Sequence, residues 1–281
     1  MGTPMATRLL AAGHDVTVWN RTLEKTRPLA DHGASVSPTP AQAASGVEAV
    51  ITMVTNSAAL EQVVLGPNGL AAALAPGQVL IDMSTVGPQT VRSIAARLAP
   101  GVTMVDAPVR GSVPEATAGR LAIYVGASSA DFLRVEPILA TLGTPHHVGG
   151  PGAGAATKVV VNSILGAAMA AFGEALALGD TLGLDRAVLM DVLAQSPIAS
   201  TVQAKRANVE SGQYPPNFKL SLALKDLRLV SEIAEQAGRH LEVVAATRDW
   251  LERAAQDGAS DLDFSAVIPT IAADGNPTPA A

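Results

Sequence analysis

The 281-residue sequence contains no cysteine, and only 3% of its residues are aromatic. Without cysteine, disulfide scaffolds, thiolate metal sites and cysteine nucleophiles are excluded. No stretch of about 20 residues is strongly apolar without polar interruption, so a membrane-spanning helix is not expected. The net charge is −6, and no basic cluster stands out, which argues against a nucleic-acid surface.

The start of the chain has no apolar core followed by a small-residue cleavage site. Secretion is therefore not predicted, and a cytoplasmic protein is expected. The length exceeds that of most single domains, which favours two packed domains.

The first segment, "MGTPMATRLLAAGHDVTVWNRT", has apolar residues at helical spacing, then a glycine, then a short apolar run. This pattern is typical of the second half of a βαβ unit. In a dinucleotide-binding unit the preceding strand leads into a G-x-G-x-x-G turn, and Gly2 stands where the third glycine would be. The first strand and the two leading glycines are absent. The simplest explanation is an assigned start that lies too late, by about one strand; a truncated, non-catalytic protein is the alternative.

Short apolar runs alternate with helical stretches through the first half of the chain, which predicts a parallel sheet covered on both faces. These runs span residues 16–19, 50–54, 79–83, 102–105 and 121–125. From Gly154 onward the pattern is helical and alanine-rich, so two domains are expected, residues 1–151 and 152–281. Residues 155–182 are apolar all round, which favours a helix at the centre of the second domain or in a subunit interface. The terminal "NPTPAA" is expected to be a disordered end.

Polar residues Asn20, Arg21 and Thr22 follow the first apolar run. In dinucleotide folds this position meets the adenine ribose, where a carboxylate suits NAD and an arginine with hydroxyl neighbours suits the 2′-phosphate of NADP. Arg21 therefore indicates NADP; an ordinary solvated arginine is the alternative.

The glycine-rich stretch "GGPGAGAATK" is not a P-loop, because three residues separate its last glycine from Lys158. It leads instead into a helix that carries Lys158 in its first turns. The helix dipole disfavours a cation there, so Lys158 is a candidate general base, with a surface lysine as the alternative. Asn162, four residues later, shares its helical face, and Met169 lies further along.

The stretch "MVDAPVRGSVPEATAGRL" forms a turn after another strand. Consecutive backbone N–H groups in such a turn can hold a carboxylate, and Arg110 can add a bidentate contact; an ordinary loop is the alternative. No metal site is expected at His146 and His147, because adjacent residues on a strand point to opposite faces. No G-x-S-x-G nucleophile motif is present.

Five stretches in order resemble the β-hydroxyacid dehydrogenase family, which is related to 6-phosphogluconate dehydrogenase. They are the opening segment, "DMSTVGP", "DAPVRGS", "GPGAGAATKVVVN" and "FKLSLALKDLRL". The resemblance implies an α/β Rossmann-like NADP-binding domain followed by an all-α substrate and dimerisation domain, within a homodimer or higher homo-oligomer. It implies an NAD(P)-dependent oxidoreductase that transfers a hydride between nicotinamide and a small β-hydroxy acid or aldehyde acid.

The resemblance also implies roles for individual residues. Lys158 and Asn162 fall on the catalytic lysine and asparagine, and Arg110, Gly111 and Ser112 fall on the loop that binds the substrate carboxylate. The residues that fall on cofactor-binding positions are Gly2, Asn20, Arg21, Thr22, Met53, Val54, Thr85, Lys225 and Asp226. No metal is implied.

The chain departs from the family pattern at three places. Arg110, Gly111 and Ser112 stand where the family usually has Ser-Gly-Gly, which leaves the substrate open. Val161 replaces the first of two paired asparagines, and the first strand is missing. A lysine as proton donor favours carbonyl over imine chemistry, with an imine reductase-like enzyme and a non-catalytic cofactor-binding protein as alternatives.

Overall fold

The computed structural model describes residues 1–274, and every strand in that part of the chain lies before residue 150. The chain divides into two units, Met1–Val159 and Val160–Ala281. The boundary lies inside the longest helix, α8 (Ala153–Thr181), close to the predicted boundary at residue 151. The predicted change from alternating strands and helices to helices alone is confirmed. The "NPTPAA" end lies outside the described residues.

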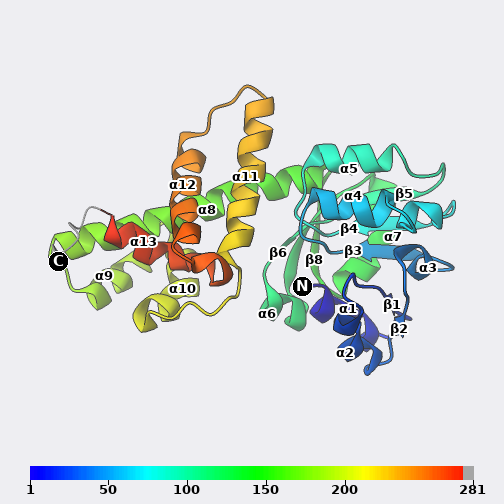
Figure 1. Cartoon of the computed structure of the whole chain (residues 1–281), viewed down its shortest axis with the longest axis horizontal. Helices are drawn as coiled ribbons and strands as arrows, with labels where there is room; N and C mark the ends of the chain where they lie inside the picture. The colour runs from blue at the N-terminus through cyan, green and yellow to red at the C-terminus, as the bar shows by residue number, and fades with distance from the viewer. Residues whose placement is uncertain (275–281) are drawn as a thin grey trace. The chain divides into compact units, whose positions relative to one another are not determined.

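The first unit contains two sheets (Figure 1). The larger sheet has the order β3-β4-β5-β7-β6, with β8 paired to β7. Its strands are β3 (Ala49–Thr52), β4 (Val79–Asp82), β5 (Thr103–Asp106), β6 (Val109–Arg110), β7 (Leu121–Gly126) and β8 (Gly143–Gly149). The smaller sheet consists of β1 (Thr17–Val18) and β2 (Ser35–Val36). The five predicted strands are present as β1, β3, β4, β5 and β7. The apolar runs did not include β2 and β6, which have two residues each, or β8, whose sequence GTPHHVG contains few apolar residues.

The larger sheet is mostly parallel, as predicted, but β7 forms antiparallel pairs within it. Strands β3, β4 and β5 run parallel, and so do β7 and β8, but β7 is antiparallel to β5 and β6. The reason is the short connection between β5 and β7, which holds only β6 and the six-residue helix α6 (Val113–Ala118). A parallel crossover normally needs a longer helical connection.

In the described part of the chain, β1 pairs with β2 alone and β3 pairs with β4 alone. In the described residues, β1 and β3 therefore each form hydrogen bonds to a neighbouring strand on one side only.

Helices cover both faces of the larger sheet. Residues of β4 and β5 alternate between two cores: Ile81 and Val105 pack with α1 (Gly2–Ala11) and α7 (Ser129–Ala140), whereas Leu80 packs with α4 (Ser57–Leu65) and α5 (Pro88–Ala95). Successive side chains of a strand point to opposite faces of the sheet, so neighbouring residues enter different cores. Both faces are apolar because helices cover both of them. Two short helices, α2 (Arg27–Ala30) and α3 (Pro40–Ala43), complete this unit.

The second unit is helical and is built around the later turns of α8. Phe172 and Leu176 of α8 are fully buried. The other helices are α9 (Arg186–Leu193), α10 (Ala199–Ser211), α11 (Leu220–Gln236), α12 (Glu242–Gln256) and α13 (Val267–Ala273). A buried ion pair joins Lys205 of α10 to Asp263, with 2.9 Å between nitrogen and oxygen.

Helix α8 is the one described helix that is long and apolar enough to span a membrane by length and composition. The helix is interrupted by Lys158, Asn162 and Glu174, so the expectation of no membrane-spanning helix stays a prediction. Core helices of soluble proteins meet the same criterion, and 44% of the apolar window is buried. Val160, Ile164 and Leu178 stay more than half exposed along the helix. The predicted subunit interface at this helix stays a prediction.

Candidate active site

The polar residues of the first unit gather where three parallel strands end. Thr52, Asp82 and Asp106 are the last residues of β3, β4 and β5 and lie side by side in the sheet register. Asp82 Oδ1 accepts hydrogen bonds from Thr52 Oγ1 at 2.8 Å and from Ser84 Oγ at 2.7 Å. Ser84 Oγ in turn accepts the N–H of Val54 at 2.9 Å. The Asp82 carboxylate thus holds the segments that follow β3 and β4.

Burial changes the acidity of both aspartates. It raises the pKa of Asp82 to about 6, against the opposing hydrogen bonds from Ser84 and Thr52, and the negative charge of Asp106 adds to the rise. Burial also raises the pKa of Asp106, while backbone N–H donors from the start of α8 oppose the rise. In the described residues, Asp82 Oδ2 has no hydrogen-bond partner. Two carboxylates thus lie next to each other in a dry environment.

The predicted cofactor-lining residues lie at this same edge of the sheet. Met53 and Val54 follow β3, Thr85 follows β4, and all three are half-buried. Ligands of open parallel sheets bind outside the carboxyl ends of the strands. The structure therefore brings these three residues to the edge at which a dinucleotide would bind.

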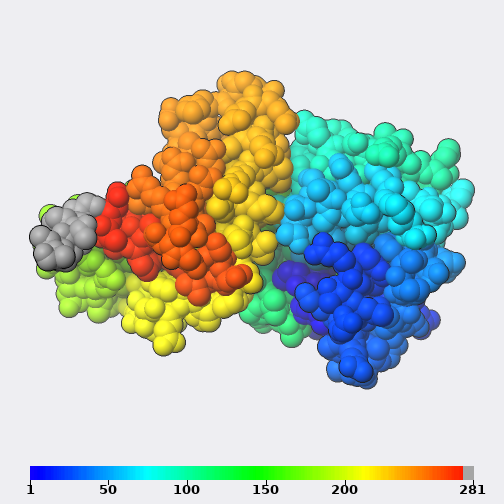
Figure 2. Space-filling model, in the orientation of Figure 1, coloured from blue at the N-terminus to red at the C-terminus, as the bar shows by residue number. Residues whose placement is uncertain are grey.

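Asn20, Arg21 and Thr22 follow β1 and are exposed. Asn20 Oδ1 accepts the N–H of Thr22 at 2.9 Å, which closes a local turn around Arg21. The segment belongs to the blue surface of the first unit (Figure 2). At Gly2, the first residue of α1, an added Cβ would meet nothing within 4 Å. The close helix–strand packing that requires the third glycine of the fingerprint is thus not seen at Gly2.

The predicted carboxylate loop lies between β6 and α6. Arg110 is exposed, and Gly111 has a φ of +124°, a conformation that favours glycine. The N–H of Ser112 donates to Glu115 Oε2 at 2.7 Å, and these two residues form a capping box for α6. The Ser112 N–H is therefore already bonded within the protein. The roles of Arg110, Gly111 and Ser112 in binding the substrate stay predictions.

Lys158 and Asn162 lie on the same helix, four residues apart. Lys158 is half-buried, and Asn162 is only 4% exposed. Asn162 Nδ2 donates to Asp226 Oδ2 of α11 at 2.7 Å, and Asp226 Oδ1 lies 2.6 Å from Lys225 Nζ. Asn162 Oδ1 accepts no hydrogen bond from any described residue. Asp226 thus fixes the Asn162 amide with its oxygen as a buried open acceptor.

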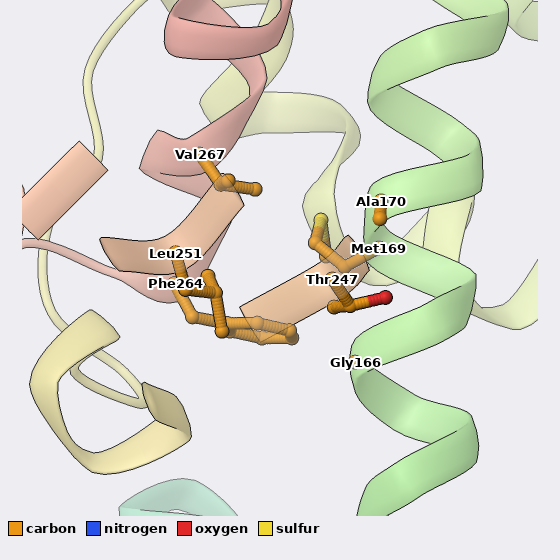
Figure 3. A pocket seen from close by; sticks show the side chains of 7 residues that line it. All are labelled: Gly166, Met169, Ala170, Thr247, Leu251, Phe264 and Val267. Carbon is orange, nitrogen blue, oxygen red and sulfur yellow. The ribbon is translucent and has the colours of Figure 1, made fainter. Parts of the chain in front are cut away.

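The void at the centre of the second unit is not a substrate site. It lies between α8, α12 and the 264–267 segment (Figure 3). It has no room for a water molecule, and its lining is almost entirely apolar. In residues 1–274, no group of three or more His, Asp or Glu side chains is arranged to hold a metal ion.

Two family patterns together span nearly the whole chain. Residues 1–160 match the NAD binding domain of 6-phosphogluconate dehydrogenase. Residues 152–271 match a family pattern described as "NAD-binding of NADP-dependent 3-hydroxyisobutyrate dehydrogenase". The chain belongs to the β-hydroxyacid dehydrogenase family.

Individual members of this family resemble the chain along its length. Glyoxylate/succinic semialdehyde reductase 1 of Arabidopsis thaliana is 36% identical, over 96% of this chain and 95% of that protein. A 3-hydroxyisobutyrate dehydrogenase of Pseudomonas aeruginosa is 37% identical, over 95% of this chain and 94% of its own length. The solved structure of Mycobacterium tuberculosis 3-hydroxyisobutyrate dehydrogenase with L-serine has a TM-score of 0.88 and 29% identity, over 96% of this chain and 95% of that one.

Membership in the β-hydroxyacid dehydrogenase family confirms the predicted fold class, a Rossmann-like domain followed by a helical domain. It also confirms the predicted enzyme class, a nicotinamide-dependent oxidoreductase that acts on small hydroxy acids. The preference for NADP, the homodimer and the cytoplasmic location stay predictions.

Asp82 and Asp106 were not among the predicted site residues of this family member. Each ends an apolar run in the sequence, and that position at the end of a predicted strand is the signal that marks them. The partners of the two carboxylates are far apart in the sequence. Only the folded sheet reveals what they bind.

Proposed function

We propose that this protein is a reductase of small aldehyde acids, and a dehydrogenase of the matching β-hydroxy acids, that prefers NADP(H). The observation that carries the proposal is the buried, open Oδ1 of Asn162, fixed by Asp226, on the helix face that also carries Lys158. An open acceptor in a buried position has a cost unless a ligand or a neighbouring cation satisfies it. A hydroxyl group or an ammonium group fits that need.

Lys158 is the proposed proton-transfer group. In the reducing direction, its ammonium gives a proton to the aldehyde oxygen as the carbon accepts a hydride, and the product is a primary alcohol. The nicotinamide, when bound, supplies the hydride. Asn162 Oδ1 accepts a hydrogen bond from the Lys158 ammonium or from the substrate hydroxyl and so orients the proton transfer.

The residues that would hold the cofactor fit a dinucleotide. The half-buried Met53, Val54 and Thr85 supply a surface at the carboxyl ends of parallel strands. Arg21 stands exposed in the turn after β1, and residues 16–23 contain no aspartate or glutamate. A guanidinium there favours the 2′-phosphate of NADP.

The preference for NADP is tested with Arg21→Asp. We expect wild type to have a higher kcat/KM with NADPH than with NADH, and the variant to reverse or remove that ratio, because a carboxylate repels the 2′-phosphate and accepts the ribose hydroxyls. Arg27→Asp, a change of the same charge at an exposed residue of α2, is the matched control. An unchanged ratio in Arg21→Asp would contradict the assignment.

The substrate class is proposed from the names of the relatives and from Arg110. Glyoxylate and succinic semialdehyde each combine an aldehyde with a carboxylate, and 3-hydroxyisobutyrate combines a hydroxyl with a carboxylate. The exposed guanidinium of Arg110 supports a carboxylate partner.

The activity is tested by following NADPH and NADH oxidation with a panel of aldehyde acids, with a cyclic imine as the comparison substrate. Turnover of aldehyde acids without turnover of the imine is the expected result. Turnover of the imine alone would assign the enzyme to imine reduction. Cofactor binding without turnover of any compound would identify a non-catalytic protein.

A further inference from the structure

Asp106, at the end of β5, caps the start of α8. Its Oδ1 accepts the N–H of Gly152 at 2.7 Å, and its Oδ2 accepts the N–H of Ala155 at 2.7 Å. The first N–H groups of a helix have no partner within the helix, and a carboxylate there also complements the helix dipole. Because Asp106 is 1% exposed, both bonds are shielded from water. One carboxylate of the sheet thus ties down the first turn of α8.

The backbone around the Asp106 carboxylate is packed so closely that Gly126 and Gly154 have no space for a side chain. A Cβ added at Gly126 would lie 2.4 Å from Asp106 Oδ1. One added at Gly154 would lie 2.3 Å from the Tyr124 carbonyl oxygen and 2.6 Å from that of Asp106. The first turn of α8 therefore lies directly on β5 and β7, and even one methyl group would push it away.

Lys158 follows Ala155 by three residues, about one helical turn, in the same unbroken helix. The position of the capped turn consequently sets the position of Lys158. We propose that Asp106 is a positioning residue for the proton transfer by Lys158, acting through the first turn of α8. This inference rests on the role given to Lys158 in the proposed function.

Asp82 provides a matched control for the backbone of α8 and for the Lys158 signal, but not for kcat, because it also holds the segments that carry the cofactor-lining residues. It is the register partner of Asp106 on β4 and is equally buried, at 1% exposure. Its hydrogen bonds go to Thr52 and Ser84 and not to α8. Asp82→Asn and Asp106→Asn therefore make the same chemical change in neighbouring strands, and only the second touches the helix that carries Lys158.

The test uses three measurements on the full chain: kcat of Asp106→Asn against wild type, and then amide exchange and the Lys158 signal in Asp106→Asn against Asp82→Asn. An asparagine has one acceptor oxygen, and its NH₂ group would face a backbone N–H, so one of the two bonds to α8 is lost. We expect kcat of Asp106→Asn to fall by about tenfold to a hundredfold, as for a slightly misplaced catalytic group, with the KM for the cofactor unchanged. We also expect faster hydrogen exchange at Gly152 and Ala155 in this variant alone.

The third measurement does not depend on activity. The chain has five lysines, so ¹³C-methylated lysine side chains give few NMR signals, and Lys158→Arg identifies that of Lys158. The signal should shift in Asp106→Asn and stay in place in Asp82→Asn. An unshifted Lys158 signal, or wild-type kcat in Asp106→Asn, would overturn the inference.

Two further outcomes are separable. If the wild-type chain turns over no aldehyde acid, the proposed function fails, and the NMR signal still decides whether Asp106 positions Lys158. If Asp106→Asn does not fold, exchange in the wild type decides: strong protection of the Gly152 and Ala155 amides supports the cap, and rapid exchange overturns it.

Discussion

The proposed function rests on two side chains, Lys158 and Arg110. Lys158 lies near the start of α8, where the Asp106 carboxylate accepts the N–H of Ala155. Arg110 ends the edge strand β6 and stands exposed. The first is assigned to the reacting oxygen of the substrate, and the second to its carboxylate.

Replacement of Lys158 by alanine should remove turnover and leave cofactor binding intact. Loss of a general acid or base typically lowers the rate by about 10² to 10⁴. We expect kcat for aldehyde-acid reduction to fall by that factor, with an unchanged Kd for NADPH measured by fluorescence. Lys25→Ala, at an exposed residue of the 3₁₀ turn after β1, is the matched control. Near wild-type turnover by Lys158→Ala would refute the catalytic assignment.

Replacement of Arg110 by serine should change the order of preferred substrates. A hydrogen bond to a charged group contributes about 1.5 to 3 kcal/mol, roughly tenfold to a hundredfold in affinity. We expect kcat/KM to fall more for a dicarboxylate aldehyde than for a monocarboxylate one. Arg120→Ser, at an exposed arginine just before β7, should leave the order unchanged. The same ranking in wild type and Arg110→Ser would show that Arg110 does not select the substrate.

Strand ends are the elements that organise the candidate site. The carboxyl ends of β3, β4 and β5 share one edge of the sheet. At that edge Asp82 accepts a hydrogen bond from Thr52, and Asp106 accepts one from Gly152, so the two carboxylates hold the chain segments around them. Because both carboxylates are buried, this arrangement lowers stability at neutral pH relative to acidic pH. Active-site regions often include such destabilising features.

Asp82 makes the stability of the first unit depend on pH in a direction unusual for a carboxylate. Its pKa is about 6 in the folded chain and near 3.8 when unfolded, so the folded state binds the proton more tightly. Its contribution to stability is fully present below pH 3.8 and is lost as the pH rises through 6. The difference in pKa corresponds to about 3 kcal/mol at neutral pH.

Asp82→Asn tests this dependence, because the amide cannot ionise and its oxygen still accepts the bonds from Thr52 and Ser84. Urea unfolding of both proteins is measured from pH 4 to pH 7. We expect the variant to gain stability relative to wild type as the pH rises. A difference that does not change with pH would mean that Asp82 titrates normally.

In the whole molecule, the second unit has its own polar anchor in Asp263. Its carboxylate accepts bonds from Lys205, Ser265 and the N–H of Phe218. Burial acts to raise the pKa of Asp263, but these donors outweigh it and lower the pKa. The cluster joins α10 to the segments on either side of α11 and α12, so we expect it to act on the unfolding of the entire unit.

Lys205→Met should destabilise the second unit strongly, because it leaves the buried Asp263 charge without its cation. Breaking a buried ion pair costs about 3 to 5 kcal/mol, and the remaining donors to Asp263 place this case near the lower end. The matched control, Lys219→Met, breaks the exposed pair of Lys219 with Asp261 and should cost less than about 1 kcal/mol. Urea unfolding in a Trp19→Phe background reads the second unit through Trp250. Equal losses in both variants would contradict the expectation.

The sequence alone was sufficient to predict the order of the elements and the enzyme family. Alternating apolar runs predicted five strands, since each strand of a covered sheet must be apolar on both faces. The long apolar run after Gly154 predicted α8, because alanine-rich segments favour helices. The motifs placed Lys158 and Asn162 on one helix, as the structure has them.

Tertiary structure alone decided the direction of β7, the bonds of Ser112, and the partners of Asp82, Asp106 and Asn162. Each depends on residues far apart in the chain: Asp106 meets Gly152 and Ala155 across β5 and α8, and Asn162 meets Asp226 across α8 and α11. Local patterns record which face of an element is apolar, because burial of that face drives folding. They do not record which donor a buried carboxylate will find, because that is settled only when the elements pack.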